Sequence, residues 1–361
     1  MRRAAAMLLM MAALAVAGSA RAAESPSRVV DRTIESKNFA GNKIGTSSSR
    51  KLAIYLPPGY DEGASRYPAI YFLPSPFDGG LRNIFDGHGA QALFDRAIAA
   101  GEIGQFILVA VDMTTPAGYS WAVNSPVTGN WEDFFVGEVV PYVDANFRTI
   151  ASRDSRGISG IFMGAQGALR LAMKHPEVFG AVYAMHPVGT GSGLRIMDSI
   201  PNLELMATAT SIDDLKADGA SMIFLGIFQA FLPDASKPPL YIDLPAHRDA
   251  SGQLIIDSAL TAKLRANFFI EEMIPAYADK LKSLRAIKFD WARSDTNQDH
   301  VYSNQALTHK LNEFGIIHEA EEYNGGWGES NWGADGRVYT EVLPFFARHL
   351  VWPDAGHAAA H

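Results

Sequence analysis

Cysteine is absent from the 361-residue sequence. This absence excludes disulfides, a thiolate nucleophile and cysteine-ligated metal sites, so core burial alone must stabilise the fold. Positively charged residues are fewer than negatively charged ones: the sequence has 31 Lys and Arg residues and 39 Asp and Glu residues, which gives a formal net charge of −8. This balance argues against nucleic acid as a partner. The sequence also lacks an HExxH motif or a tight His/Asp cluster, so we predict no metal site and no cofactor.

Apolar runs long enough to span a bilayer comfortably are lacking as well. The run at 7–17 is short, follows Arg2 and Arg3, and precedes Ala20-Arg21-Ala22, a small-x-small cleavage site. We therefore predict a signal peptide over residues 1–22 or 1–23, a secreted or periplasmic protein, and no stable membrane span after processing. A retained membrane anchor is the alternative.

Short apolar runs alternate with helical stretches through most of the chain. Runs with strand composition occupy residues 51–56, 69–73, 106–111, 157–161, 181–185, 287–291 and 318–323. This alternation predicts an α/β fold with a mostly parallel, doubly wound sheet. Residues 188–285 interrupt the rhythm, with a Pro-rich passage and a predicted long helix over 261–284. We expect residues 24–361 to form a single domain, with a helical cap at about 188–285 covering one end of the sheet.

The stretch 156–169, RGISGIFMGAQGAL, lies between a predicted strand and a predicted helix. Gly160 and Gly164 flank Phe162 with the spacing of a nucleophile elbow, the sharp strand-to-helix turn that presents a catalytic serine. Small residues allow the backbone to turn tightly, and the start of the helix stabilises developing negative charge. In this chain the centre of the elbow is Phe162, which has no nucleophilic atom.

Together with the elbow, several segments resemble an esterase family of the α/β-hydrolase fold. This family includes enterochelin esterases, feruloyl and acetyl esterases, S-formylglutathione hydrolases and the mycobacterial mycolyltransferases. The matching segments are YLPPGY at 55–60, NSPVTGNW at 124–131, RTI at 148–150 and HPEVFG at 175–180. The resemblance covers roughly residues 50–350. It implies the α/β-hydrolase fold and a triad in the chain order Ser, Asp, His.

The resemblance implies that two of the three triad positions are substituted. The serine position is Phe162. The histidine position, which the family has in a Y-x-G-x-H pattern after the last strand, is Trp327. The acid position is Asp295, with Asp299 as the fallback, although either Asp could instead be a turn residue or a helix cap.

Two further observations also indicate that catalytic groups have been lost. No histidine occurs between His318 and His349, so a small shift of the alignment does not restore the catalytic base. We expect His318 and His349 themselves to be structural. The family's first oxyanion donor follows the strand at 69–73. If Pro76 takes that position, it has no N–H to donate, whereas the second donor, the N–H of Met163, is retained.

The sequence therefore favours a catalytically degenerate esterase-family protein. The alternative is an active carboxylic-ester hydrolase with displaced catalytic residues. The candidates for these are Ser75, Ser125 and Ser159, and the pair Asp299 and His300 on the acid turn. None of them has a spacing argument in its favour.

Aromatic substitutions would turn a polar catalytic cleft into an apolar one. We expect Phe162 and Trp327 to face each other, with Tyr119 and Trp121 completing a cleft under the cap. Such a cleft binds a small apolar, aromatic or carbohydrate ligand, unless Phe162 and Trp327 simply fill it. If Phe162 and Trp327 are the vacated triad positions, we expect that restoring ester hydrolysis requires Phe162→Ser and Trp327→His together.

Overall fold

The computed structural model of the chain describes residues 25–191, 200–328 and 331–353. The predicted signal peptide lies outside the described residues. Within them, the helices are all too short or too polar to cross a bilayer.

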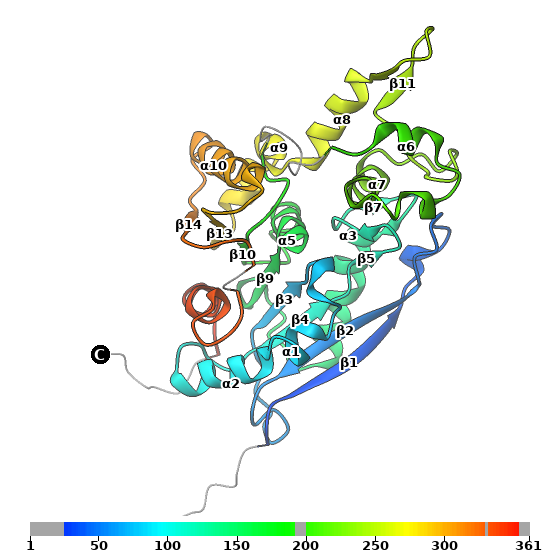
Figure 1. Cartoon of the computed structure of the whole chain (residues 1–361). Coiled ribbons are helices and arrows are strands. Elements are labelled where there is room, and N and C mark those ends of the chain that lie inside the picture. Colours follow the sequence, from blue (N-terminus) through cyan, green and yellow to red (C-terminus); the bar gives the residue numbers. More distant parts are fainter. Residues whose placement is uncertain (1–24, 192–199, 329–330, 354–361) are drawn as a thin grey trace, which may run out of the picture.

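One eight-stranded sheet organises the molecule, with the strand order β1-β2-β4-β3-β9-β10-β13-β14. Its strands are β1 (Arg28–Glu35), β2 (Ser49–Leu56), β3 (Ala69–Leu73), β4 (Ile107–Val111), β9 (Arg156–Ile161), β10 (Ala181–Met185), β13 (Ala286–Ala292) and β14 (Glu319–Tyr323). The β1–β2 and β2–β4 pairs are antiparallel, and the other pairs are parallel. The sheet runs from β1 on the right of Figure 1 to β13 and β14 on the left. The predicted α/β class and the mostly parallel sheet are confirmed.

Helices cover both faces of the sheet, as the fully apolar central strands require. Alternation along β9 sends Gly157 and Gly160 to opposite faces. Gly157 faces Phe346 of α11 (Leu343–His349), and Gly160 faces Gly164 of α5 (Met163–Lys174). Contacts between aromatic rings of the strands and of the helices place α2 (Ala90–Ala100) on the same face of the sheet as α11. They place the continuous helical stretch α3 (Trp131–Phe134), η3 (Phe135–Val139) and α4 (Val140–Asn146) on the α5 face.

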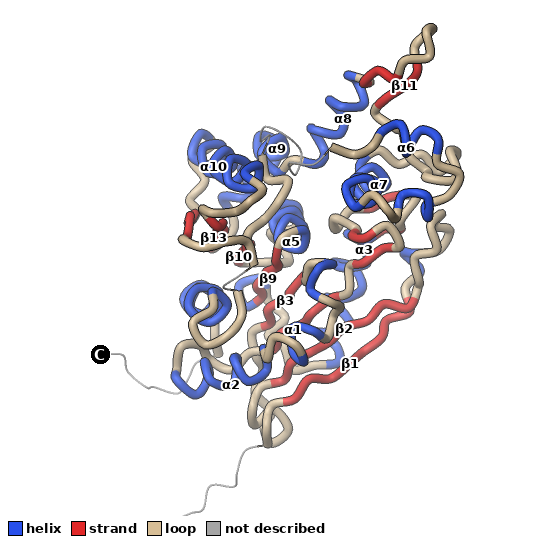
Figure 2. Tube along the Cα trace, in the orientation of Figure 1, coloured by secondary structure: helices blue, strands red, loops and turns tan. Residues whose placement is uncertain are grey.

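Between β10 and β13 the chain leaves the main sheet and is mostly helical (Figure 2). Its elements are α6 (Leu203–Thr208), η6 (Ile212–Leu215), α7 (Gly219–Phe231), the hairpin β11 (Ala246–Arg248) and β12 (Leu254–Ile256), α8 (Ser258–Phe268) and α9 (Ile270–Lys282). The predicted single helix over 261–284 is wrong, because Phe269 is extended between α8 and α9. The carbonyl of Phe268 accepts hydrogen bonds from Gln166 and Arg170 of α5, which satisfy it at the break.

The remaining elements are short, apart from α10. They are η1 (Lys37–Phe39), η2 (Pro76–Asp78), α1 (Asn83–Asp86), β5 (Thr114–Thr115), β6 (Gly118–Tyr119), β7 (Asn124–Ser125), β8 (Gly129–Asn130), η4 (Arg153–Ser155), α10 (Gln298–Glu313) and η7 (Val338–Val342). The loops after β9, β10 and β13 leave the same edge of the sheet, because the three strands are neighbours and parallel. Ligands of open α/β sheets bind at such carboxyl ends.

Candidate active site

A sharp turn between β9 and α5 holds Phe162, with φ 56° and ψ −114°. Positive φ is an outlier for a bulky side chain, and such strain persists only where the surrounding structure imposes it. Two glycines make the turn possible. A Cβ on Gly160 would lie 2.5 Å from the carbonyl of Gly164, and one on Gly164 would lie 1.9 Å from the carbonyl oxygen of Leu73. The backbone therefore has the tight turn of a nucleophile elbow, with an aromatic residue at its centre.

Phe162 is buried in a cluster of rings. Its ring centroid lies 4.9 Å from that of Trp327, 5.1 Å from that of His300 and 5.8 Å from that of Phe77, all in edge-on contacts. Phe162 is 6% exposed, whereas Trp327 is 37% and Phe77 55% exposed. We call Phe162, Trp327 and Phe77 the aromatic plug. The expected meeting of Phe162 and Trp327 occurs, and the plug fills the elbow.

Behind the plug lies a buried His–Asp–His cluster. Asp295, in the turn after β13, receives hydrogen bonds at Oδ2 from His186 Nε2 and His300 Nδ1, each 2.7 Å long. Its Oδ1 accepts the N–H of Asn297 at 2.8 Å. All three members of the cluster are buried. Burial raises the pKa of the Asp295 carboxyl, but these hydrogen bonds outweigh burial and hold the pKa well below its usual range.

The proton positions in this cluster follow from its partners. The N–H of Ala292 donates to His186 Nδ1 at 3.1 Å, so Nδ1 is unprotonated and Nε2 carries the proton shared with Asp295. Burial lowers the pKa of His186 despite the hydrogen bond to Asp295, which keeps this imidazole neutral. In His300, Nδ1 donates to Asp295, and Nε2 lies 3.1 Å from the amide nitrogen of Asn297. In the neutral form of His300, this arrangement leaves the lone pair on Nε2.

The same cluster has the composition of a two-histidine, one-carboxylate metal site, since the three candidate ligand atoms lie within 4.8 Å of one another. The hydrogen bond from Ala292 argues against a metal here. A neutral imidazole has one lone pair, and the Ala292 N–H occupies that of His186, which leaves Nε2 protonated. The donor set therefore fits a hydrogen-bonded relay better than a metal ion.

The other predicted positions lie as follows. Met163 is the first residue of α5, so its N–H has no acceptor within the helix. Pro76 begins η2, three residues after the end of β3, and has no N–H to donate. Asp299 is buried in the first turn of α10. His318 and His349 lie near Glu319 at the amino end of β14, away from the elbow.

The three serines considered as alternative nucleophiles make other hydrogen bonds. The Ser159 hydroxyl donates to the carbonyl of Tyr183 at 2.8 Å, and that of Ser125 to the carbonyl of Gln229 at 2.6 Å. Both serines are buried, at 0% and 1% exposure. Ser75 is also buried, and its Oγ accepts the N–H of Phe77. None of these arrangements is the serine–imidazole pair that activates a hydroxyl.

Tyr119 and Trp121 lie outside the ring cluster around Phe162. They pack against each other with centroids 6.2 Å apart, and Trp121 packs on Phe268 at 5.1 Å. Both are almost fully buried, at 2% and 1% exposure. The expectation that they complete a cleft with Phe162 and Trp327 is therefore wrong. These rings fill the interface with the segment between β10 and β13 instead.

A pocket of about 450 Å³ opens beside the plug. Its lining residues are Phe77, Gly79, Asn83, His88, Ile161, Trp327, Gly328, Asn331 and Trp332. The rings of His88 and Trp332 are stacked, 5.5 Å apart and 4° from parallel. No Asp, Glu, Lys or Arg lies among these described lining residues. We call this cavity the aromatic pocket.

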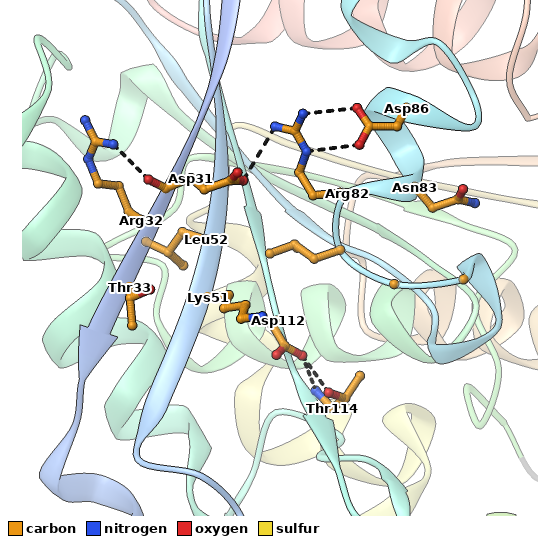
Figure 3. Close-up of a pocket in the computed structure, with 13 residues that line it drawn as sticks. Asp31, Arg32, Thr33, Lys51, Leu52, Arg82, Asn83, Asp86, Asp112 and Thr114 are labelled. Atoms are coloured by element: carbon orange, nitrogen blue, oxygen red, sulfur yellow. Dashed lines mark hydrogen bonds and ion pairs between the residues drawn. The ribbon is translucent and has the colours of Figure 1, made fainter.

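A larger cavity, of about 660 Å³, lies on the other side of the loop that carries Gly79 and Asn83. Figure 3 shows Arg82 pointing toward both Asp86 and Asp31 there, at 3.0 Å and 3.5 Å. These ion pairs are exposed to solvent and contribute little stability. Neither Phe162 nor the histidine cluster lines this cavity, so we regard it as a surface groove.

Nothing in the sequence pattern singles out His186, although it directly follows the strand run 181–185. Its place at the carboxyl end of a predicted parallel strand is the only signal that could have found it. His300 could be considered only as a partner of Asp299 on the acid turn. In the structure His300 Nδ1 lies 2.7 Å from Oδ2 of Asp295, five residues earlier in the chain.

Comparisons with known proteins agree with this fold. The family model described as "Putative esterase" matches residues 45–223. An esterase of Mycobacterium tuberculosis (strain H37Rv) is 32% identical over 152 residues, covering 41% of this chain and 32% of that protein. The S-formylglutathione hydrolase of Rattus norvegicus is 30% identical over 172 residues, covering 42% of this chain and 56% of the rat protein. The matches thus span about a third and just over half of these relatives.

Solved structures extend the likeness to most of the chain. A ferulic acid esterase superposes with a TM-score of 0.61 at 20% identity, covering 90% of this chain and all of that one. The S-formylglutathione hydrolase of Staphylococcus aureus gives a TM-score of 0.54 at 10% identity, with 90% and 99% covered. At these identities the likeness shows the α/β-hydrolase fold. With the family match and the relatives, it establishes that the chain belongs to the esterase family of the α/β-hydrolase fold.

Proposed function

We propose that this esterase-family protein does not hydrolyse esters through a serine nucleophile, and that it binds a small neutral ligand in the aromatic pocket. The observation that carries the first part is Phe162 at the centre of the elbow, between β9 and α5. A phenyl ring cannot attack a carbonyl, and Trp327, at the family's histidine position, cannot shuttle a proton at neutral pH.

An active hydrolase with displaced residues has less support. The hydroxyls of Ser125 and Ser159 are buried and bonded to backbone carbonyls. A water-activating mechanism would need a water at His300, which is 4% exposed and has the ring of Phe162 against it. We therefore favour a protein in which the chemistry is lost and the fold is retained.

The chemistry of the aromatic pocket indicates the class of ligand. Its described lining has no ionised carboxylate or amine, so nothing there compensates the desolvation of a charged ligand. Trp327 and the stacked His88–Trp332 pair offer ring faces, which favour a sugar ring or an aromatic acyl group. Some relatives are named for feruloyl esters, whose acyl group is aromatic. We propose a neutral, ring-bearing ligand of this kind.

Calorimetric titration of the purified protein with methyl ferulate, cellobiose and decanoate tests the ligand class. We expect methyl ferulate or cellobiose to bind and decanoate, which is anionic and has no ring, not to bind. Trp332→Ala should weaken binding about two- to tenfold, because an aromatic contact contributes roughly 0.5–1.5 kcal/mol.

Trp352→Ala is the matched control. Trp352 packs on Gly104 and donates to the carbonyl of Ala347, outside the aromatic pocket, so its removal should leave the affinity unchanged. If neither ring-bearing compound binds, the aromatic plug only fills the old site. Equal losses in the two variants would place the ligand elsewhere.

We also propose export of the protein, as its N-terminal sequence predicts. N-terminal sequencing of protein recovered from the periplasm or the medium should begin at Ala23 or Glu24. Recovered protein that still begins at Met1 would contradict this proposal.

A further inference from the structure

The histidine cluster lies where a hydrolase would need its base, although the family's histidine position holds Trp327. His300 is in edge contact with Phe162, with ring centroids 5.1 Å apart and planes at 82°. The side chain at position 162 therefore points at this imidazole. Trp327 covers Phe162 from the more exposed side, since it is 37% exposed and His300 is 4% exposed.

We propose that His300, oriented by Asp295, is a preserved general base for position 162, and that the base of this chain is not at position 327. This inference rests on the proposed function, because it takes Phe162 as the vacated nucleophile position. It adds that an acid–base pair, Asp295 and His300, is retained although the nucleophile is lost.

The hydrogen bonds give His300 the form that a base requires. In a triad, one ring nitrogen donates to the acid and the other accepts the proton of the nucleophile. His300 Nδ1 donates to Asp295 at 2.7 Å, and Nε2 faces the amide nitrogen of Asn297 at 3.1 Å. An amide N–H is a donor, so Nε2 is the accepting nitrogen of the neutral ring, and the contact with Asn297 has to open before Nε2 can accept a proton from a nucleophile at position 162.

His186 orients the acid from its other side. Its Nε2 donates to the same oxygen of Asp295, and the Ala292 N–H fixes its tautomer. Asp295 is thus held by His186, His300 and the N–H of Asn297, and is 3% exposed. A carboxylate held in this way keeps the His300 ring in one orientation and stabilises it when it gains a proton. His186 is therefore a positioning residue.

One oxyanion donor of a serine site is also in place, whereas Pro76 cannot supply the other. Met163 opens α5 directly after position 162, so its N–H can serve a developing oxyanion. The aromatic pocket is lined by Ile161 and Trp327, the chain neighbour and the ring neighbour of Phe162. Removal of the Phe162 ring should open a path from this pocket to His300.

A cysteine at position 162 tests the base without requiring turnover. The chain has no other cysteine, so Phe162→Cys in the full chain provides a single thiol. If His300 accepts its proton, the thiol pKa falls below the ordinary value of about 8.5. Each unit of that shift raises the thiolate fraction at pH 6 by about tenfold, which outweighs the lower nucleophilicity of the less basic thiolate. We expect at least tenfold faster alkylation in Phe162→Cys than in Phe162→Cys with His300→Gln.

Phe162→Ser tests the same base by chemistry. We expect a fluorophosphonate probe to label the introduced serine, and p-nitrophenyl acetate to be hydrolysed, without any change at Trp327. Addition of His300→Gln should slow both reactions about a hundredfold or more, since a general base contributes roughly 10²–10⁴-fold. Circular dichroism checks that each variant is folded.

Two results would overturn this inference. One is a folded Phe162→Cys whose alkylation rate is unchanged by His300→Gln. The other is a folded Phe162→Ser that reacts only when Trp327→His is added, which would return the base to position 327. Labelling of the unmutated protein would instead contradict the proposed function, so the two failures are distinguishable.

Discussion

Gly164→Ala is expected to destabilise the fold by about 3 kcal/mol or more, at the upper end of overpacking effects. The added Cβ would lie 1.9 Å from the carbonyl oxygen of Leu73 and 2.7 Å from its carbonyl carbon. Both are backbone atoms of β3, a central strand between β4 and β9, so the clash cannot be relieved by a side-chain rotation. Urea unfolding followed by circular dichroism measures the loss.

Gly219→Ala is the control for this change. Gly219 is the first residue of α7, and a Cβ there would meet no atom within 4 Å. This substitution should be neutral or slightly stabilising, because alanine favours the helix. Equal stabilities of the two variants would show that α5 does not approach β3 as closely as the elbow requires.

Arg337→Met is expected to cost about 3–5 kcal/mol of unfolding free energy, the range for removing one partner of a buried ion pair. Arg337 Nε lies 2.7 Å from Oδ2 of Asp290, which is 1% exposed. The remaining partners of Asp290 are the Tyr183 hydroxyl and the N–H of His186, which are neutral. Loss of the guanidinium leaves a buried carboxylate without a compensating charge.

Arg293→Met provides the matched control. Arg293 also pairs with a carboxylate, that of Glu322 at 2.6 Å, but its side chain is 60% exposed. An exposed pair contributes about 0–1 kcal/mol, so the same chemical change should have a small effect. If the two variants lose the same free energy in urea unfolding, the pair between Arg337 and Asp290 is not a buried support of the site.

Much of the fold follows from local sequence signals. The runs 69–73 and 181–185 coincide with β3 and β10, and the other five predicted strands differ from the observed bounds by one or two residues. Period and composition locate such elements because central strands are apolar on both faces. The predicted helix over 261–284 fails because tertiary contacts decide the break at Phe269. The hydrogen bonds from Gln166 and Arg170 that satisfy the Phe268 carbonyl join residues about a hundred positions apart.

The site was only partly predictable. The elbow at Phe162 could be located because its glycine spacing is local, and Asp295 could be suggested because it follows a predicted strand. His186 reaches Asp295 only because β10 and β13 are neighbours, with Met185 opposite Asp290. Strand order is not encoded in any local pattern. The same limit explains Trp121, which the chain turns inward onto Phe268 rather than toward Phe162.

Fluorophosphonate labelling of the unmutated protein is the most direct test of the proposed loss of the nucleophile. The protein and an active serine esterase would be treated with the probe in parallel and analysed by intact mass and peptide mapping. We expect the active esterase to be fully modified. We expect no modified serine in this chain, because Phe162 occupies the elbow and the hydroxyls of Ser125 and Ser159 are bonded to backbone carbonyls. Stoichiometric labelling at any serine of the unmutated protein would contradict the account.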